Sequence, residues 1–283
     1  MNTRKKVIVI MTMLAFIVSV TVFAAESGID WSNGTIRAVG MAAGKSGEKR
    51  VSLAKAQARR AARMDALRNL AEQMGGVRVT SESSMKDLAL VYDDVRTGME
   101  AIIKNMQEAG EPKFYDDGVC ELVLEVPLWG ANSSLAEVAF LPFKDEVKVA
   151  FPQPSTTSTG ENTAVAGATI NDKPYTGVVI DCSGLVLHSV MSPVIKNDKG
   201  QSIYGHQNLD YDKVIEFGMA SYASSVNDRA VTKRAGSNPI VVKAVDVENH
   251  NVNPVVAVSD ADAILIANQR DHFLDNCAVV FVR

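Results

Sequence analysis

The segment Gly40–Ser46 (GMAAGKS) contains residue types that could hold a phosphate, because it places two glycines before a lysine and a serine. A P-loop needs four residues between its glycines, so that successive backbone N–H groups can wrap the phosphates. Only three residues separate Gly40 from Gly44 in this chain. The sequence therefore predicts a polar turn here and no nucleotide site.

Asn208, Asp210 and Asp212 match the first three ligand positions of a calcium-binding loop. Lys213 stands where that loop needs a glycine, and Met219 stands where it needs a bidentate glutamate. The histidines are scattered and form no HExxH motif, and the chain has no CxxC pair that would indicate zinc. They are His188, His206, His250 and His272. We therefore predict no metal site.

Asp181, Ser183 and His188 have the residue types of a hydrolytic triad. Successive side chains of a strand point to opposite faces, however, and this spacing does not orient a nucleophile, a base and an acid toward one another. No GxSxG nucleophile elbow occurs in the chain. The segment is typical of a turn, and we expect a protein with no catalytic residue and no cofactor.

Eight basic residues and two acidic residues lie between positions 45 and 68. A basic helix can bind an acidic protein, an anionic surface or an acidic polymer. The candidate partner-binding residues are Arg59, Arg60, Arg63 and Arg68. The alternative interpretation is a solvated helix face, because these arginines spread around much of the helix circumference.

The chain has 283 residues, of which 47% are hydrophobic and 22% charged, as in an ordinary globular protein of about two domains. Its formal net charge is -4. Removal of three basic residues near the N-terminus with a signal peptide would lower this charge to about -7. An acidic chain does not favour nucleic-acid binding, which depends on neutralising phosphates.

Residues 1–24 have the organisation of a secretory signal peptide: a basic start, an apolar stretch and a small-residue end. Val22 and Ala24 fit a cleavage site before Ala25 or Glu26, and the alternative is an uncleaved anchor. No cysteine near this site could carry a lipid, and no other stretch is apolar enough to span a bilayer. We therefore expect an exported protein of the periplasm or cell envelope.

Export permits disulfides, and the chain has three cysteines, Cys120, Cys182 and Cys277. An odd number leaves at least one of them unpaired. Each lies in an apolar, β-rich context, which favours buried free thiols. If any pair forms, we expect Cys182 with Cys277, because these two share the second half of the chain.

The first half of the chain has the patterns of an α+β module over about residues 28–145. Residues 35–42 and 120–128 alternate like strands, and Asp116-Asp117-Gly118 marks a turn. A long Ala-rich helix is predicted from Ser52 to about Met74, with Gly75-Gly76 as a left-handed stop. Its apolar residues form two opposite stripes, one of Leu67, Leu70, Ala71 and Met74 and one of Ala54, Ala58, Ala61 and Ala62. A short strand at 77–80 and a helix at about 84–95 should follow. We expect the helices to cover one face of a small antiparallel sheet.

Residues 150–173 are rich in Ser, Thr, Pro, Gly and Ala without periodicity, which predicts a flexible linker. Residues 174–283 then form a second, mixed α/β module. It has strands at TGVVIDCSGLVL, IVVKAVDV and the C-terminus, a hairpin turn at residues 197–200 and helices at about 211–224 and 260–267. The predicted fold class is α+β, in two modules.

The first module resembles the N-terminal domain of the flagellar assembly protein T family and the related small outer-membrane lipoproteins. Three segments carry this resemblance over about residues 30–130: WSNGTIRAVG, AKAQARRAARMDALRNLAEQMGGVRV, and the turn at Asp117-Gly118 with the following strand that ends in PLWG. The second module resembles the region that often accompanies such domains, through TGVVIDCSG and RAGSNPIVVKAV. The resemblance implies a non-catalytic envelope protein, which in some members builds rings around the flagellar basal body.

These observations together predict an exported protein that acts through protein–protein contacts in flagellar or outer-membrane assembly. Its partners would be envelope or flagellar basal-body proteins. The alternative is a periplasmic ligand- or peptidoglycan-binding module, although the chain has only 2 Trp to line a pocket. An extracytoplasmic hydrolase is a third, weaker interpretation.

Overall fold

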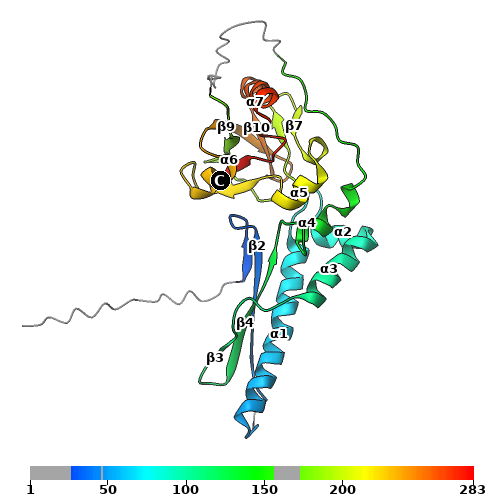
Figure 1. The fold of residues 1–283 in the computed structure, drawn as a ribbon, viewed down its shortest axis with the longest axis vertical. Coiled ribbons are helices and arrows are strands. Elements are labelled where there is room, and N and C mark those ends of the chain that lie inside the picture. The colour runs from blue at the N-terminus through cyan, green and yellow to red at the C-terminus, as the bar shows by residue number, and fades with distance from the viewer. Residues whose placement is uncertain (1–26, 46, 156–172) are drawn as a thin grey trace, which may run out of the picture.

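A computed structural model describes residues 27–45, 47–155 and 173–283. The predicted signal peptide, Ser46 and most of the predicted linker lie outside these residues. The described residues form an α+β fold with two separate sheets, which confirms the predicted fold class. Figure 1 shows an elongated molecule, in which an arm built on the first sheet extends away from a rounder body built on the second.

The first module contains an antiparallel four-stranded sheet in the order β1-β2-β4-β3. Its strands are β1 (Gly28–Asp30), β2 (Thr35–Ala43), β3 (Lys113–Phe114) and β4 (Val119–Pro127). The long central strands pair from Thr35 opposite Pro127 to Ala43 opposite Val119. The turn between β3 and β4 has Gly118 at φ +83, as the predicted Asp-Gly turn requires.

Helix α1 (Val51–Gly76) packs along one face of this sheet and forms most of the arm (Figure 1). Its buried positions step by four residues through Ala58, Ala62 and Ala66. Small residues are needed here, because a Cβ added at Gly40 of β2 would lie 2.1 Å from the Ala62 carbonyl oxygen. The backbones of helix and strand therefore lie in direct contact.

The predicted left-handed stop of this helix is wrong. Gly75 and Gly76 are the last two residues of the helix, and neither has a left-handed backbone. Val77 follows in extended conformation and donates its N–H to the Met74 carbonyl. Residues 77–80 form only an isolated bridge, between Arg78 and Ser84, in place of the predicted strand.

Four shorter helical elements complete the first module. Ser84 begins helix α2 with a capping box in which its side chain accepts from the Asp87 N–H and the Asp87 carboxylate accepts from the Ser84 N–H. The predicted helix at 84–95 is divided at Tyr92, which lies in extended conformation between two helices. The elements are α2 (Met85–Val91), α3 (Asp93–Asn105), α4 (Leu135–Ala139) and a 3₁₀ turn η1 (Leu141–Phe143).

The second module contains a mixed seven-stranded sheet in the order β7-β6-β10-β9-β5-β11-β8. Its strands are β5 (Gly177–Asp181), β6 (Ile195–Asn197), β7 (Ser202–Tyr204), β8 (Ser221–Ala223), β9 (Pro239–Glu248), β10 (Asn253–Val256) and β11 (Val279–Val282). Strands β9, β5 and β11 and the edge strand β8 are parallel to one another. The predicted hairpin turn joins β6 to β7, which pair antiparallel.

Helices cover both faces of the central strands in this module. The helical elements are η2 (His206–Asn208), α5 (Tyr211–Phe217), α6 (Arg229–Ala235) and α7 (Val258–Asp271). On one face Val179 and Val280 pack with Val231 of α6. On the other, Phe281 belongs to the main apolar cluster together with Ile264 of α7. Strands that are covered on both sides explain the continuous apolar sequence VVFV of β11.

Two predicted helix boundaries in this module are wrong. The helix predicted at 211–224 ends at Phe217, because Gly218 at φ +72 terminates it and the chain then forms β8. Helix α7 (Val258–Asp271) begins two residues before and ends four residues after the predicted range of about 260–267.

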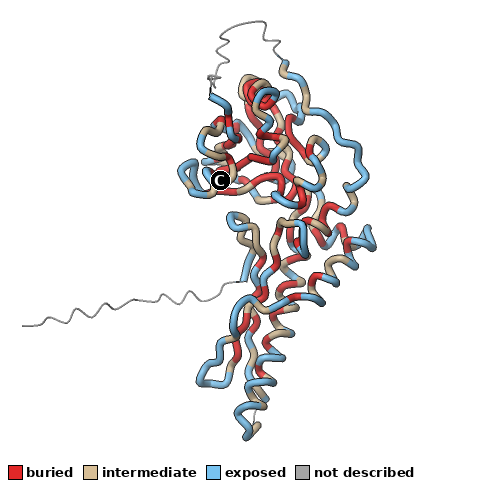
Figure 2. Tube along the Cα trace, viewed as in Figure 1, coloured by how far each residue is buried: buried red, intermediate tan, exposed pale blue. Residues whose placement is uncertain are grey.

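The two modules share one apolar cluster, although their sheets are separate. Three backbone hydrogen bonds also join them: Met191 N–H to the Arg78 carbonyl (3.0 Å), Ser192 N–H to the Val79 carbonyl (2.8 Å), and Gly130 N–H to the Ile215 carbonyl (2.9 Å). Figure 2 shows that buried residues continue from the body into the adjoining part of the arm. The domain boundaries themselves stay a prediction.

Candidate functional site

The residues that could have formed a nucleotide, calcium or hydrolytic site have structural partners instead. Gly44 lies against α1, where an added Cβ would be 2.6 Å from the Ala54 carbonyl oxygen. The Asp210 carboxylate accepts from the Lys213 N–H and caps α5. The Asp181 carboxylate accepts from the Ser183 N–H at 2.9 Å, as in a turn. These contacts place the three motifs in turns and helix caps.

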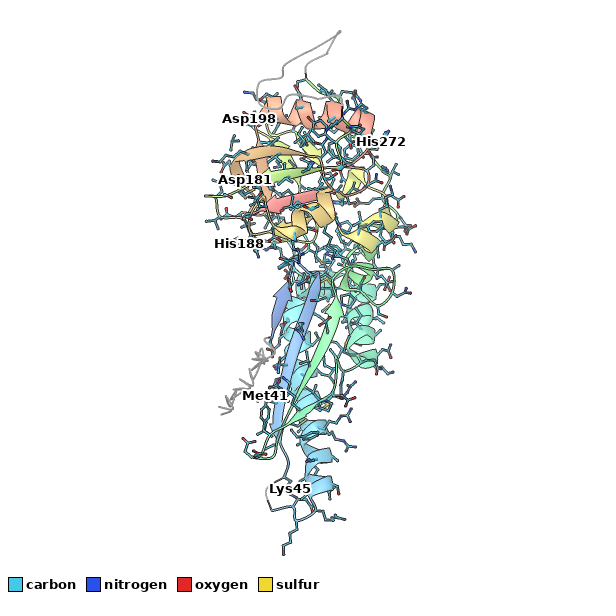
Figure 3. All side chains as sticks on the ribbon, turned by 60° about the vertical axis from the view of Figure 1, so that its left-hand side comes forward. Met41, Lys45, Asp181, His188, Asp198 and His272 are labelled. Carbon is cyan, nitrogen blue, oxygen red and sulfur yellow. The ribbon has the colours of Figure 1, made fainter. Side chains whose placement is uncertain are left out.

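The histidines are as scattered in space as they are in sequence. Figure 3 shows His188 and His272 at opposite sides of the second module. Among the residues that the structure describes, no three His, Cys, Asp or Glu side chains are grouped so that they could hold a metal ion. In the same part of the chain, no helix has both the length and the apolar composition needed to cross a bilayer.

The four candidate arginines of α1 do not form one site. Arg59 and Arg63 both pair with Glu108, at 2.8 and 3.4 Å, on one flank of the helix. The hydrogen bond and the charge of Glu108 raise the pKa of Arg59. Arg68 pairs with Asp65. Arg60 is exposed and has no ion pair among the described residues, so it is the one of the four whose charge faces solvent without a partner.

The outer face of the four-stranded sheet, opposite α1, is open. Its residues form three cross-strand pairs of β2 and β4, which are Arg37 with Glu125, Val39 with Val123 and Met41 with Glu121. The first pair is an ion pair at 3.1 Å, the second is half-buried, and Met41 is 51% exposed. Glu121 is buried, because Tyr115 donates its hydroxyl to the Glu121 carboxylate and Lys113 pairs with it. Figure 3 shows Met41 on the sheet side of the arm and Lys45 near its tip. We call these six residues the open sheet face.

A cleft of about 660 Å³ lies where the two modules meet. The first module contributes the turn after β1 and Trp129, two residues after the end of β4, and the second contributes α5, β8, α6 and the loop before β11. Its lining residues are Trp31, Ser32, Asn33, Gly34, Trp129, Glu216, Phe217, Ser221, Ala230, Lys233, Arg234 and Asn276. Both tryptophans of the chain therefore line this one cleft.

The Trp129 indole is held between two glycines, one from each module. A Cβ added at Gly34 would lie 3.1 Å from Trp129 Cδ1, and one added at Gly218 would lie 2.5 Å from Trp129 Cδ2. Both glycines have left-handed backbone angles, φ +69 and φ +72, which other residues rarely adopt. The narrow slot between them fixes the ring in the wall of the cleft.

Trp31 is fixed by the second module. Its ring meets Tyr222 edge to face, with centroids 5.7 Å apart and an interplanar angle of 73°. Tyr222 is itself anchored, because its hydroxyl donates to the Val190 carbonyl and accepts from the Val190 N–H. Aromatic pairs of this geometry add to the stability that area burial provides.

Arg234 lies at the base of the cleft and binds three backbone carbonyls, those of Cys277, Phe217 and Gly218. Phe217 ends α5, so the guanidinium satisfies a helix C-terminus, where a cation is favourable. Burial lowers the pKa of Arg234, because it penalises the charged form. Neither Arg234, Lys233 nor Glu216 has an ion-pair partner among the described residues.

Most polar groups in the cleft wall are donors. Neither indole N–H has a hydrogen-bond partner in the described structure, and neither is among its buried unsatisfied atoms, which are Gln73 Oε1 and Ser189 Oγ. Both N–H groups are therefore open to solvent. Lys233 adds an exposed ammonium, and Arg234 keeps two of its five N–H groups free of the carbonyl bonds.

These cleft residues were not predicted from the sequence. A low aromatic content argues against a pocket when residues are counted, but the fold brings both tryptophans together from positions about a hundred residues apart. A usable signal was present, because each tryptophan stands beside a turn, at WSNG and at WG.

All three cysteines are buried free thiols, so the Cys182–Cys277 disulfide is not present in this structure. Burial raises the pKa of Cys182 to about 12, which makes it a poor nucleophile. Burial likewise raises the pKa of Cys277. Neither thiol lines the cleft.

Comparison with known families gives a match for the second module. Residues 177–283, from the first residue of β5 to the C-terminus, match the family model of the second domain of Treponema pallidum Tp0624. No curated protein matches the chain. The matched part is less than half of the chain, so it describes the second module alone.

The resemblance to the flagellar assembly protein T family and the small outer-membrane lipoproteins is wrong. The family model that matches the chain belongs to another family. It matches residues 177–283, outside the residues 30–130 that carried the resemblance. The physical reason is that the Ala-rich pattern indicates close packing of α1 against β2, which is not specific to one family. Ala62 and Ala66 are small because the backbone of β2 lies against them at Gly40, and any helix in that position needs small residues.

Proposed function

We propose that the chain is an exported, non-catalytic cell-envelope protein that acts through protein–protein contacts made by its arm. Export is supported by the basic start, apolar stretch and small-residue end of residues 1–24. The observation that carries the proposal is the open sheet face, which has α1 behind it and on which Arg37, Met41 and Glu125 are exposed.

The open sheet face has the mixed character of a contact surface. An apolar centre of Val39, Val123 and exposed Met41 lies beside the ion pair of Arg37 with Glu125. Apolar residues rimmed by polar ones are typical of protein-binding patches. Because this surface extends along β2 and β4 beside α1, it is also rigid.

Arg60 is the cation of α1 that we assign to an acidic partner. The charges of Arg59, Arg63 and Arg68 are engaged within the chain, and a partner would have to break those pairs to use them. Reversing Arg59 and Arg63 would therefore change the arm itself as well as any docking.

Site-specific photo-crosslinking tests the proposal in intact cells. A photo-reactive residue at Met41 should give an adduct with a discrete envelope protein, identified by mass spectrometry. The matched control places the same residue at Leu90, which is 79% exposed on α2, away from the sheet. In a separate co-purification assay, Met41→Glu should lower recovery of that partner several-fold and Leu90→Glu should not. Equal adducts at both positions, or none at Met41, would refute the arm as the contact surface.

A further inference from the structure

The cleft between the modules has the size and composition of a small-molecule site. Its volume of about 660 Å³ falls within the range of about 300–1,000 Å³ for ligand pockets. Such pockets combine aromatic walls with a few fixed polar groups and occur preferentially at domain interfaces. The rings of Trp31, Trp129 and Phe217 supply the walls here, and two of them are held by contacts with the opposite module.

The polar groups of the cleft specify the charge of its ligand. Lys233 and Arg234 carry two positive charges and Glu216 carries one negative charge, with no ion pair among the three. The carbonyls of Phe217 and Gly218 hold the guanidinium in place, so it cannot turn away to solvent when the cleft is empty. The net charge of +1 is complementary to a monoanion.

The remaining groups suit a ring that carries hydroxyls. Indole faces pack against the C–H faces of a ring, and the open indole N–H groups donate to oxygen. Asn33 Nδ2 donates to Asp30 Oδ2 (2.7 Å) and Asn276 Oδ1 accepts from Lys213 Nζ (2.8 Å). The Asn33 amide oxygen can therefore accept from a ligand, the Asn276 amide nitrogen can donate to one, and exposed Glu216 can accept from hydroxyls. A simple aromatic acid has no hydroxyls with which these two free amide groups and Glu216 could bond.

We infer that this cleft binds a small acidic sugar, with the carboxylate at Lys233 and Arg234 and the sugar ring against Trp31 and Trp129. The inference does not depend on the proposed function, because the cleft and the open sheet face share no residue. Failure of one leaves the other intact.

Intrinsic tryptophan fluorescence is a direct probe, because the chain has two tryptophans and both line the cleft. Glucuronate and glucose form a matched pair that differs in the carboxylate. Titration of the full chain with glucuronate should change the emission saturably, at a Kd about tenfold below that for glucose. Equal affinity for the two sugars, or no emission change with glucuronate, would overturn the inference.

Lys233→Gln tests the assigned cation without disturbing the fold, because this side chain is exposed and has no described partner. It should weaken glucuronate binding by about three- to tenfold and leave glucose binding unchanged. Lys199→Gln, in the exposed β6–β7 turn, is the control and should bind both sugars normally. If the two variants behave alike, the carboxylate does not bind at Lys233.

Two further measurements sharpen the ligand assignment. Trp31→Phe keeps a ring but removes the N–H, and it should weaken both sugars while Trp129 still reports binding. Glucose 6-phosphate carries a different anion on the same ring. If it binds more tightly than glucuronate, the cleft selects phosphate, and the carboxylate assignment is refuted.

Discussion

The two modules build their cores in opposite ways. In the first, a helix lies so close to a strand that Gly40 touches the backbone of α1, and the buried helix positions there are alanines. In the second, large side chains such as Phe281 and Ile264 fill the space on one face of a broad sheet, and α6 covers the other. The first core therefore has no room for an added methyl group at Gly40, and the second depends on large side chains to fill its interior.

The same difference determines which surfaces of the two modules are available for binding. A sheet covered on one face leaves its other face available, as along β2 and β4, whereas a sheet covered on both faces is a scaffold. A binding surface on the second module must then come from loops, helix ends and the junction with the arm. The cleft, with α5, α6 and the loop before β11 in its wall, is such a junction.

The largest effect is expected when a large side chain is removed from the second core. Phe281 is fully buried and its ring lies 5.7 Å from that of Tyr222. Phe281→Ala should lower the free energy of unfolding by about 3–5 kcal/mol, through lost burial and the cavity left behind. Urea unfolding followed by circular dichroism measures this. Val245→Ala, at a position that is 54% exposed, is the control and should cost below about 0.5 kcal/mol. Similar losses for both variants would contradict the comparison.

A smaller effect is expected when one methyl group is added to the first core. The Cβ of Gly40→Ala would lie 2.1 Å from the Ala62 carbonyl oxygen and 2.4 Å from the Ala66 nitrogen, and neither backbone atom can rotate away. We expect a loss of about 2–3 kcal/mol in the same unfolding assay. Gly28→Ala adds the same group to the neighbouring strand, where nothing lies within 4 Å. If Gly40→Ala were as stable as Gly28→Ala, the close approach of α1 and β2 would be wrong.

The smallest effect is expected on the surface of α1. Arg59 and Arg60 are neighbouring, exposed arginines of α1. Arg59 pairs with Glu108, whereas Arg60 has no ion pair among the described residues, so the two positions are a matched pair for this contact. Arg59→Gln should lower the urea midpoint slightly at low salt, and Arg60→Gln should leave it unchanged. At about 1 M salt, where charges are screened within about 3 Å, the difference should disappear. A difference that persists at high salt would show that packing, and not charge, distinguishes the two arginines.

The sequence predicted the long helix well, and it predicted only in part the face that the helix buries. The apolar pattern suggested two opposite stripes, one of Leu67, Leu70, Ala71 and Met74 and another of Ala54, Ala58, Ala61 and Ala62. Half of these residues are buried, namely Ala58, Ala62, Leu70 and Met74. The buried residues instead form one stripe in steps of four, from Ala58 to Met74. Each step of four residues turns about 40° around the helix axis, so the stripe winds around α1. Local periodicity cannot show this, because the winding follows neighbours that are distant in sequence.

The strand order and the cleft could not be predicted from the sequence for the same reason. Three-residue strands such as β6, β7 and β8 are too short to show a period, and the order of the seven strands depends on crossovers that local patterns do not encode. The cleft needs Trp31, Trp129 and Arg234 together, which only the packing of the two modules provides.

The slot around Trp129 also has a consequence for the order in which the molecule can be completed. One wall of the slot, Gly34, has been synthesised before Trp129, but the other, Gly218, follows about ninety residues later. As the chain emerges N-terminus first, the four-stranded sheet and α1 can assemble while one face of the indole has no cover. The packing of this ring between the two glycines is therefore completed late. A chain truncated before Gly218 would leave one face of the indole exposed as an apolar surface that chaperones can bind.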